Sequence, residues 1–215
     1  MEEFISQKQH IYNFISSEIS QGNLEYNGRL TEQYITDKLT ISRTPVREAL
    51  FQLAADGVLE HTPRKGFRIK KLSQEEVMEI YQLIGVLDGK AAELSLPQLT
   101  EEDFSTMQFL IDAMKSSINN KLYTKYNELQ LQFHQVYTAK CGNQSLITAL
   151  EKYKQSFLGT TYKNIPGAAI QATLHETNEE HQEILALLKK KEAMKLRQFI
   201  EDVHWCGERA KYDIW

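Results

Sequence analysis

A helix with a cationic start is predicted by the stretch Ser42-Arg43-Thr44-Pro45-Val46-Arg47-Glu48-Ala49-Leu50. The Thr44 hydroxyl can cap this helix, and Pro45 suits the first helical position, where a missing N–H costs nothing. Val46, Leu50 and Leu53 recur at helical spacing, so their face should pack inward. The two arginines then lie at the exposed start of the helix. Free N–H groups and guanidinium groups there favour phosphates and base edges in the DNA major groove.

The residues before this stretch predict a shorter helix. It covers residues 30–39, with Thr31 as the expected cap and with Ile35 and Leu39 as an apolar pair one turn apart. Residues 40–43 form the short turn between the two helices. The sequence therefore predicts a helix-turn-helix.

A β-hairpin is predicted directly after the cationic helix. Gly57 is the expected C-terminal cap of that helix. Residues 58–61 and 67–70 have the character of strands and flank a basic tip, Pro63-Arg64-Lys65-Gly66. The unit is thus a winged helix-turn-helix, in which one helix enters the major groove and the wing contacts the backbone or minor groove.

The composition limits the class of protein. The chain has 215 residues, enough for two domains of ordinary size. Its net charge is −4, but residues 42–71 hold seven Lys/Arg against three Asp/Glu, which favours local contact with DNA. We expect neither a membrane span nor a signal peptide, because no apolar run is long enough. Cys141 and Cys206 lie far apart, so reduced thiols and a cytoplasmic location are expected.

Helical periodicity replaces the strand signals from Ser73 onward. Pro97 ends the first of these helices, and Thr100 is the expected cap of the next. The helices predicted outside the winged motif cover residues 4–20, 73–96, 101–119, 122–140, 144–160, 170–190 and 192–212. The fold class is therefore mainly α.

Residues 8–71 resemble the DNA-binding domain of the GntR family of bacterial transcription regulators. The resemblance is carried by Arg29-Leu30-x-Glu32, by residues 42–50, by Leu53 and Gly57, and by Pro63-Arg64-Lys65-Gly66-Phe67. The remainder is similar to the all-helical ligand-binding domain of the FadR/FCD branch of that family. The resemblance implies a winged helix-turn-helix domain over residues 1–71. An all-α helical bundle for effector binding and dimerisation would follow over residues 72–215.

The predicted DNA contacts come from the helix start and the wing. They are Arg29, Ser42, Arg43, Thr44, Arg47, Arg64, Lys65 and Gly66. Two alternatives stay open. Some winged helices bind proteins instead of DNA, and Arg47 could form a surface ion pair with Asp37 or Glu48.

The resemblance also implies a metal site, because many members hold a divalent ion through one Asp and three His. Gln130 stands at the Asp position here, one helical turn before His134. His181 matches the second histidine, but the third position is Val203, with His204 one place later. One helical step rotates a side chain by about 100°, so His204 needs a bulge or shifted turn to join. A histidine-dominated site favours zinc or nickel. Alternatively, these histidines are polar pocket or core residues.

A second departure from the family concerns the ligand pocket. The inward arginine that binds carboxylate ligands in many members is replaced by Ile84, which lies on the apolar stripe of its helix. The predicted pocket residues are Ile84, Gln130, His134 and His181. A small organic acid held at the position of Ile84 is therefore not expected.

The sequence as a whole predicts a DNA-binding transcription regulator controlled by a small-molecule effector. We expect a repressor that acts as a homodimer on double-stranded operator DNA, because two winged domains can recognise a pseudo-palindrome. The effector would change the spacing or tilt of those domains. One alternative is a regulator whose helical domain only dimerises. The other is a metal-dependent hydrolase that uses His134 and His181. Against this alternative, the sequence offers no carboxylate ligand for the metal and no evident nucleophile.

Overall fold

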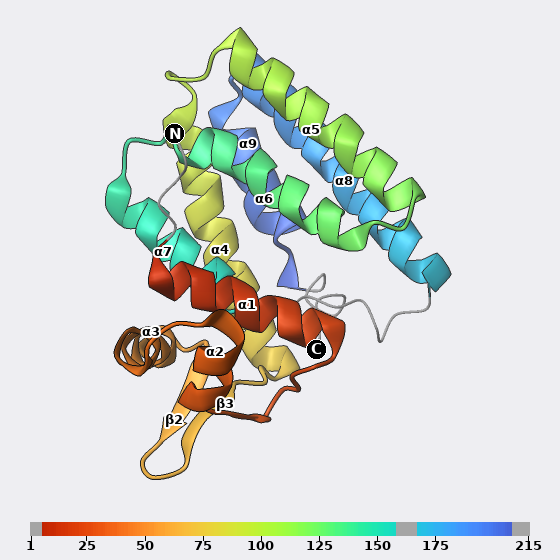
Figure 1. Cartoon of the computed structure of the whole chain (residues 1–215). Helices are drawn as coiled ribbons and strands as arrows, with labels where there is room; N and C mark the ends of the chain where they lie inside the picture. The colour runs from red at the N-terminus through yellow and green to blue at the C-terminus, as the bar shows by residue number, and fades with distance from the viewer. Residues whose placement is uncertain (1–5, 158–166, 208–215) are drawn as a thin grey trace. The chain divides into compact units, whose positions relative to one another are not determined.

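The computed structural model describes residues 6–157 and 167–207 (Figure 1). The elements in order are α1 (Gln7–Gln21), β1 (Arg29–Leu30), α2 (Glu32–Leu39), α3 (Arg43–Ala55), β2 (Leu59–Thr62), β3 (Gly66–Ile69), α4 (Gln74–Ser95), α5 (Glu101–Asn119), α6 (Tyr123–Thr138), α7 (Gln144–Lys154), α8 (Gly167–Lys190), α9 (Ala193–Phe199) and the π-turn η2 (Ile200–His204). The fold is mainly α, as predicted. Within the described ranges, the helices are too short or too polar to cross a membrane.

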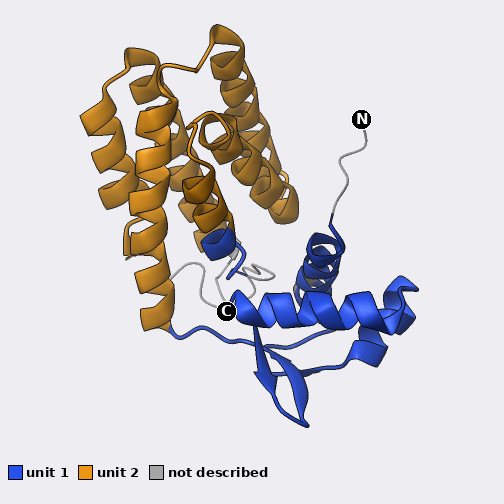
Figure 2. Cartoon of the chain, turned by 90° about the vertical axis from the view of Figure 1, so that its left-hand side faces the viewer, with its two compact units in different colours: residues 1–73, 152–161, 215 blue, residues 74–151, 162–214 orange. Residues whose placement is uncertain are grey.

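Two compact units make up the described chain (Figure 2). The first contains α1 to β3 and runs to Ser73, and it also includes residues 152–157. The second begins at Gln74, the first residue of α4, and contains the remaining helices apart from residues 152–154 at the end of α7. Each unit has its own hydrophobic core.

The first unit is a winged helix-turn-helix. Its three helices and an antiparallel sheet of strand order β1-β3-β2 share one core. That core includes Ile11, Ile15, Leu30, Ile35, Val46, Leu50, Leu53, Phe67 and Ile69. Thr62 pairs with Gly66, so residues 63–65 form the hairpin loop. The two hairpin strands lie within one residue of their predicted positions, whereas β1 was not predicted.

The predicted N-terminal cap is confirmed for α2 and is wrong for α3. Thr31 Oγ1 accepts a hydrogen bond from Tyr34 N at 3.1 Å, which confirms Thr31 as the cap of α2. Thr44 is not the cap of α3, because Ser42 occupies the N-cap position with extended backbone. Pro45 is therefore the third helical residue. N–H groups in the first turn have no intrahelical partner, so the proline still costs no hydrogen bond.

Gly57 follows the end of α3 and terminates it, as predicted. Its φ is +80°, its N–H donates to Ala54 O at 3.1 Å, and Val58 N–H donates to Leu53 O at 2.9 Å. These two bonds form a Schellman motif, in which the left-handed position strongly favours glycine. The motif turns the chain directly into the wing.

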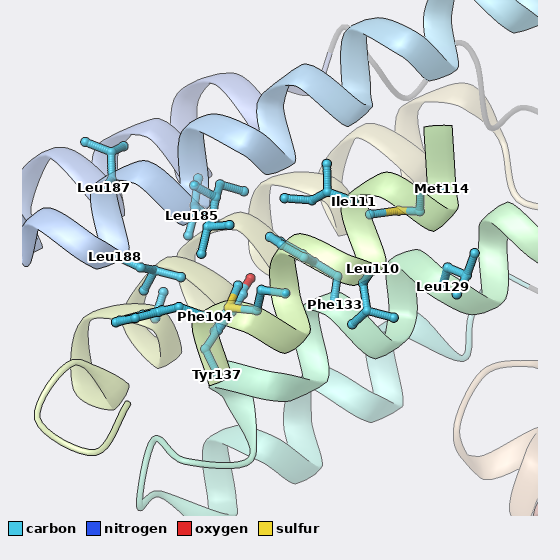
Figure 3. Packing of buried hydrophobic residues seen from close by; sticks show 14 of the residues in the cluster. Phe104, Leu110, Ile111, Met114, Leu129, Phe133, Tyr137, Leu185, Leu187 and Leu188 are labelled. Carbon is cyan, nitrogen blue, oxygen red and sulfur yellow. The ribbon is translucent and has the colours of Figure 1, made fainter. Parts of the chain in front are cut away.

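The second unit is an all-helical bundle. α5 packs against α6 and α8, and α4 packs against α6, α9 and η2. These contacts bury one apolar cluster, part of which is shown in Figure 3 and which includes Phe104, Leu110, Phe133, Tyr137, Leu185 and Leu188. A capping box fixes the start of α5: Thr100 N–H donates to Asp103 Oδ2 at 2.7 Å, and Asp103 N–H donates to Thr100 Oγ1 at 3.3 Å.

Two predicted helices of the bundle end earlier than expected. α7 ends at Lys154 instead of residue 160, although residues 158–160 lie outside the described chain. α9 ends at Phe199, and residues 200–204 form a single π-turn where a continuous α-helix was predicted. Residues 208–212 of that prediction lie outside the described chain.

Candidate nucleic-acid interface and metal centre

Two exposed arginines at the start of α3 are held by the first turn of α2. Arg47 donates from Nε to Glu32 Oε1 at 2.7 Å and from one terminal nitrogen to Oε2 at 2.9 Å. Arg43 donates to the Gln33 side chain. The hydrogen bond from Arg47 lowers the pKa of Glu32, which is consistent with a persistent ion pair. The two helices of the motif are therefore joined at their N-terminal ends by side chains.

The partner of Arg47 differs from both alternatives considered in the sequence. Glu32 forms the ion pair, and neither Asp37 nor Glu48 does so. The Arg47 side chain is 60% exposed, so this pair contributes little to stability. It does fix the direction of the guanidinium, and Glu32 does not engage its other terminal nitrogen. A guanidinium oriented in this way can meet a phosphate or a base edge at low entropic cost.

The sheet and its hairpin loop carry further cationic side chains. Arg64 and Lys65 are exposed in the loop, and Gly66 opens β3 with a φ of +86°. Arg29 is exposed on β1 and pairs across the sheet with Arg68 of β3. Arg68 is also exposed and was not among the predicted contacts. The alternation of buried and exposed residues along β3 is the signal that would have identified it.

An aromatic contact connects the wing to α3. The Phe51 ring centroid lies 4.7 Å from that of His61 and 5.2 Å from that of Phe67. This packing holds the hairpin against the helix that carries the arginines. Ser42 and Thr44, the remaining predicted contacts, are exposed at the start of α3. All the predicted DNA contacts therefore lie on α3, at its N-cap, or on the sheet and hairpin loop of the first unit.

Three buried histidines meet in the second unit. His134 comes from α6, His181 from α8 and His204 from η2. His134 Nε2 lies 3.3 Å from His181 Nε2 and 3.2 Å from His204 Nε2. The ligand atoms of the three rings all lie within 4.8 Å of one another. The structure thus brings together the three residues named as metal ligands from the sequence.

A π-turn brings His204 into this cluster. The resemblance places the third ligand at Val203, and in an α-helix the next side chain would point about 100° away. Trp205 N–H donates to Ile200 O at 3.0 Å, so the turn contains one extra residue. His204 is consequently 7% exposed and Val203 is 40% exposed. The structure therefore contains the shifted turn that His204 needs in order to join the other two histidines.

Two glycines of α4 make room for the π-turn. Gly85 and Gly89 are one helical turn apart and face the C-terminal segment. A Cβ atom at Gly85 would lie 3.1 Å from Trp205 Cβ, and one at Gly89 would lie 3.1 Å from Arg197 O. Side chains at these positions would push α9 and η2 away from α4. The glycines therefore help to position His204.

Buried carboxylates lie behind two of the histidines. Asp88 Oδ2 is 2.9 Å from His134 Nδ1, and Glu180 Oε2 is 2.9 Å from His204 Nδ1. Glu180 can only accept, so the proton of the His204 ring lies on Nδ1. His134 Nδ1 also lies 2.6 Å from the Tyr137 hydroxyl, which donates its own proton to Asp88 and therefore accepts from His134. In both rings Nε2 keeps its lone pair. Tyr137 also donates to Asp88 Oδ2, at 2.9 Å. Burial and the Asp88 charge raise the pKa of Tyr137 well above its ordinary value, so this hydroxyl stays protonated.

The convergent nitrogens fit a divalent metal. Neutral His134 and His204 rings would face each other with two lone pairs 3.2 Å apart, a repulsive arrangement that a cation relieves. Tetrahedral zinc, with zinc–nitrogen bonds of about 2.0–2.1 Å, separates its nitrogen ligands by about 3.3 Å. The Nε2–Nε2 separations of 3.2 Å and 3.3 Å from His134 to the other two rings agree with that value. The residues present can therefore hold such an ion.

The other two predicted pocket residues, Ile84 and Gln130, are not members of the histidine cluster. Ile84 is fully buried on α4, as predicted, and Gln130 is half-buried on α6, one turn before His134. Neither carboxylate was among the residues predicted from the sequence. Asp88 lies one turn after Ile84 on an otherwise apolar stripe, where a charged residue indicates a buried polar partner. Glu180 directly precedes one of the clustered histidines.

Comparisons with known proteins agree with both units. Residues 7–69 match the family of bacterial regulatory proteins called gntR, and residues 79–203 match the FCD domain. The HTH-type transcriptional regulator YdhC of Bacillus subtilis is 27% identical over 190 residues, which cover 88% of this chain and 84% of the relative. The HTH-type transcriptional repressor RspR of Escherichia coli is 22% identical over 184 residues, which cover 86% and 79%.

A solved structure shows the same fold. Escherichia coli McbR/YncC superposes with a TM-score of 0.78 and 22% identity, over 94% of each chain. The FCD match alone spans more than half of the sequence, and the gntR match spans most of the rest. These matches confirm the resemblance noted in the sequence. The chain therefore belongs to the gntR family of bacterial regulatory proteins and carries an FCD domain.

Proposed function

We propose that this regulator is a repressor that binds operator DNA as a homodimer and responds to a small-molecule effector in its FCD domain. The observation that carries the proposal is the pair of exposed arginines at the start of α3, one oriented by Glu32. The gntR match supports DNA binding. The name of the relative RspR, a repressor, supports the direction of control.

In this proposal, residues 1–71 make the DNA contacts. Arg43 and Arg47 meet bases or phosphates in the major groove, and Lys65 lies nearer the backbone. The remaining contacts come from Arg29, Ser42, Thr44, Arg64 and Gly66. One winged domain touches too few bases to select a single genomic site, so residues 72–215 would bring two chains together on a pseudo-palindrome.

The FCD domain would hold one divalent ion, zinc or nickel, through His134, His181 and His204. Three protein ligands leave a coordination position that an oxygen or nitrogen atom of an effector can fill. Neither Ile84 nor Gln130 offers a charge to an effector. We therefore expect an effector that is larger and partly apolar, in place of a simple hydroxy or dicarboxylic acid. Such control takes place in the cytoplasm, where the DNA is.

Selection of bound sequences from a random DNA pool, followed by footprinting, tests this function. We expect an enriched pseudo-palindrome and protection of both half-sites. Zinc-loaded protein is then screened with metabolites for release of the selected DNA. Equal binding to all sequences would overturn the proposal. An enriched palindrome whose binding no metal or metabolite changes would show that the helical domain only dimerises.

A further inference from the structure

The ligands of the histidine cluster are all neutral, although the proposed ion carries two positive charges. The family aspartate is replaced by Gln130, which lies outside the cluster. An uncompensated charge in a buried site is costly. Two carboxylates nevertheless lie one hydrogen bond away from the ligand rings: Asp88 is 0% exposed and Glu180 is 7% exposed.

We propose that Asp88 and Glu180 supply the negative charge of this centre from behind its histidines, and that metal binding depends on them. The inference rests on the metal site proposed above. Glu180 accepts the Nδ1 proton of His204 at 2.9 Å. Asp88 Oδ2 lies 2.9 Å from His134 Nδ1, which also contacts the Tyr137 hydroxyl at 2.6 Å, and that hydroxyl donates to Asp88. Both arrangements direct the Nε2 lone pairs to the centre. Together the two charges equal the charge of a divalent ion, so the loaded site is neutral as a whole.

The surroundings strengthen this interaction. The Phe133 ring centroid lies 4.7 Å from that of His181, and Trp205 lies 5.6 Å from His204 and 5.8 Å from His134. Aromatic rings exclude water and lower the local dielectric. The carboxylates and the proposed metal ion, which one imidazole ring separates, therefore interact more strongly here than they would in water.

Asp88 accepts further hydrogen bonds within the bundle. Asp88 Oδ2 also accepts from Tyr137 at 2.9 Å and from Trp205 Nε1 at 2.8 Å, so it connects α4 to α6 and to the residue after η2. Asp88 thus has a structural role besides the proposed one. Glu180 contacts His204 from the helix that also carries His181. Glu180 is the first position to test.

The test replaces Glu180 with glutamine in the full chain. The new amide can donate to His204 Nδ1, which moves the ring proton to Nε2 and blocks the ligand nitrogen. Zinc affinity, measured by competition with a chelator, should fall about 10- to 100-fold. Glu179→Gln is the matched control, because Glu179 is the exposed neighbour on the same helix, and its affinity should not change. Asp88→Asn should lower zinc affinity by a similar factor, and it should also lower the melting temperature of the metal-free protein.

Two further readouts separate metal binding from folding. The visible spectrum of bound cobalt(II) reports the ligand set, and melting of the metal-free variants shows that each affinity is measured on folded protein. Wild-type zinc affinity in both Glu180→Gln and Asp88→Asn would overturn the inference while leaving the metal site intact. Failure of the unmodified chain to bind zinc, nickel or cobalt would instead overturn the metal site itself.

Discussion

Replacing Arg47 with alanine should weaken operator binding and leave the fold intact. The side chain is 60% exposed, and its ion pair with Glu32 lies at the surface. Exposed pairs of this kind contribute about 0–1 kcal/mol, so the melting temperature should change little. By contrast, a guanidinium that binds a guanine edge contributes about 1–3 kcal/mol of discrimination.

The expected loss of affinity can be worked out from these values. About 1.4 kcal/mol corresponds to a tenfold change, so the loss of one contact lowers affinity about 5- to 150-fold. A dimer on a pseudo-palindrome loses the contact twice, and independent losses multiply to at least about 25-fold. Glu32 would also lose the cation that screens it from the DNA phosphates. Its repulsion of the phosphates adds to the loss.

Fluorescence anisotropy at fixed salt, with the selected operator and a scrambled duplex, measures this effect. Arg47→Ala should lose most of the preference for the operator. Arg197→Ala is the control, because it removes an Arg–Glu pair from α9 in the other unit and should leave operator affinity unchanged. Wild-type affinity in a folded Arg43→Ala/Arg47→Ala double variant would refute the assigned docking of α3.

Four other outcomes are expected. The full chain should sediment as a dimer without DNA at micromolar concentration, and a clean monomer would remove the palindrome argument. Zinc or nickel should raise the melting temperature, because a ligand bound only by the native state stabilises it. His134→Ala should abolish this shift, and an unchanged wild-type melting temperature with zinc, nickel and manganese would contradict the metal site. Small dicarboxylic acids should release the operator only after Ile84→Arg, so tight release of the unmodified protein would show that another residue supplies the positive charge. Exchanging Val203 and His204 should abolish zinc binding, whereas retained binding would show that the π-turn can revert to an α-helix.

Much of the first unit could be predicted because its signals are local. The Thr31 cap, the glycine after α3 and the two strands of the wing each depend on a few consecutive residues. The start of α3 was misplaced because Ser42 and Thr44 are both good caps, and their order alone does not decide between them. β1 was missed for a different reason. Arg29 pairs with Arg68, which lies far along the chain, and a strand of this length is too short to show alternation of apolar and polar residues.

The histidine cluster could be predicted only in part. His134 and His181 follow from the resemblance, but the direction of His204 depends on a π-turn that packs against Gly85 and Gly89 of α4. The register of that turn is therefore set by residues more than one hundred positions away in sequence. Asp88 was visible as a charged residue on an apolar stripe. Its partners could not be named before the helices were placed.

In the proposed function, a ligand at the histidine cluster would influence DNA binding through α4. Asp88 connects α4 to His134 of α6 and to Trp205 after η2, so we expect a change of charge at the centre to act on several helices together. Packed helices shift as units, because close-packed cores do not deform continuously. Residues 70–73 alone separate the end of β3 from the start of α4. In the proposed mechanism, we therefore expect a displacement of α4 to reach the wing through this short covalent connection, as ligand control of a repressor requires.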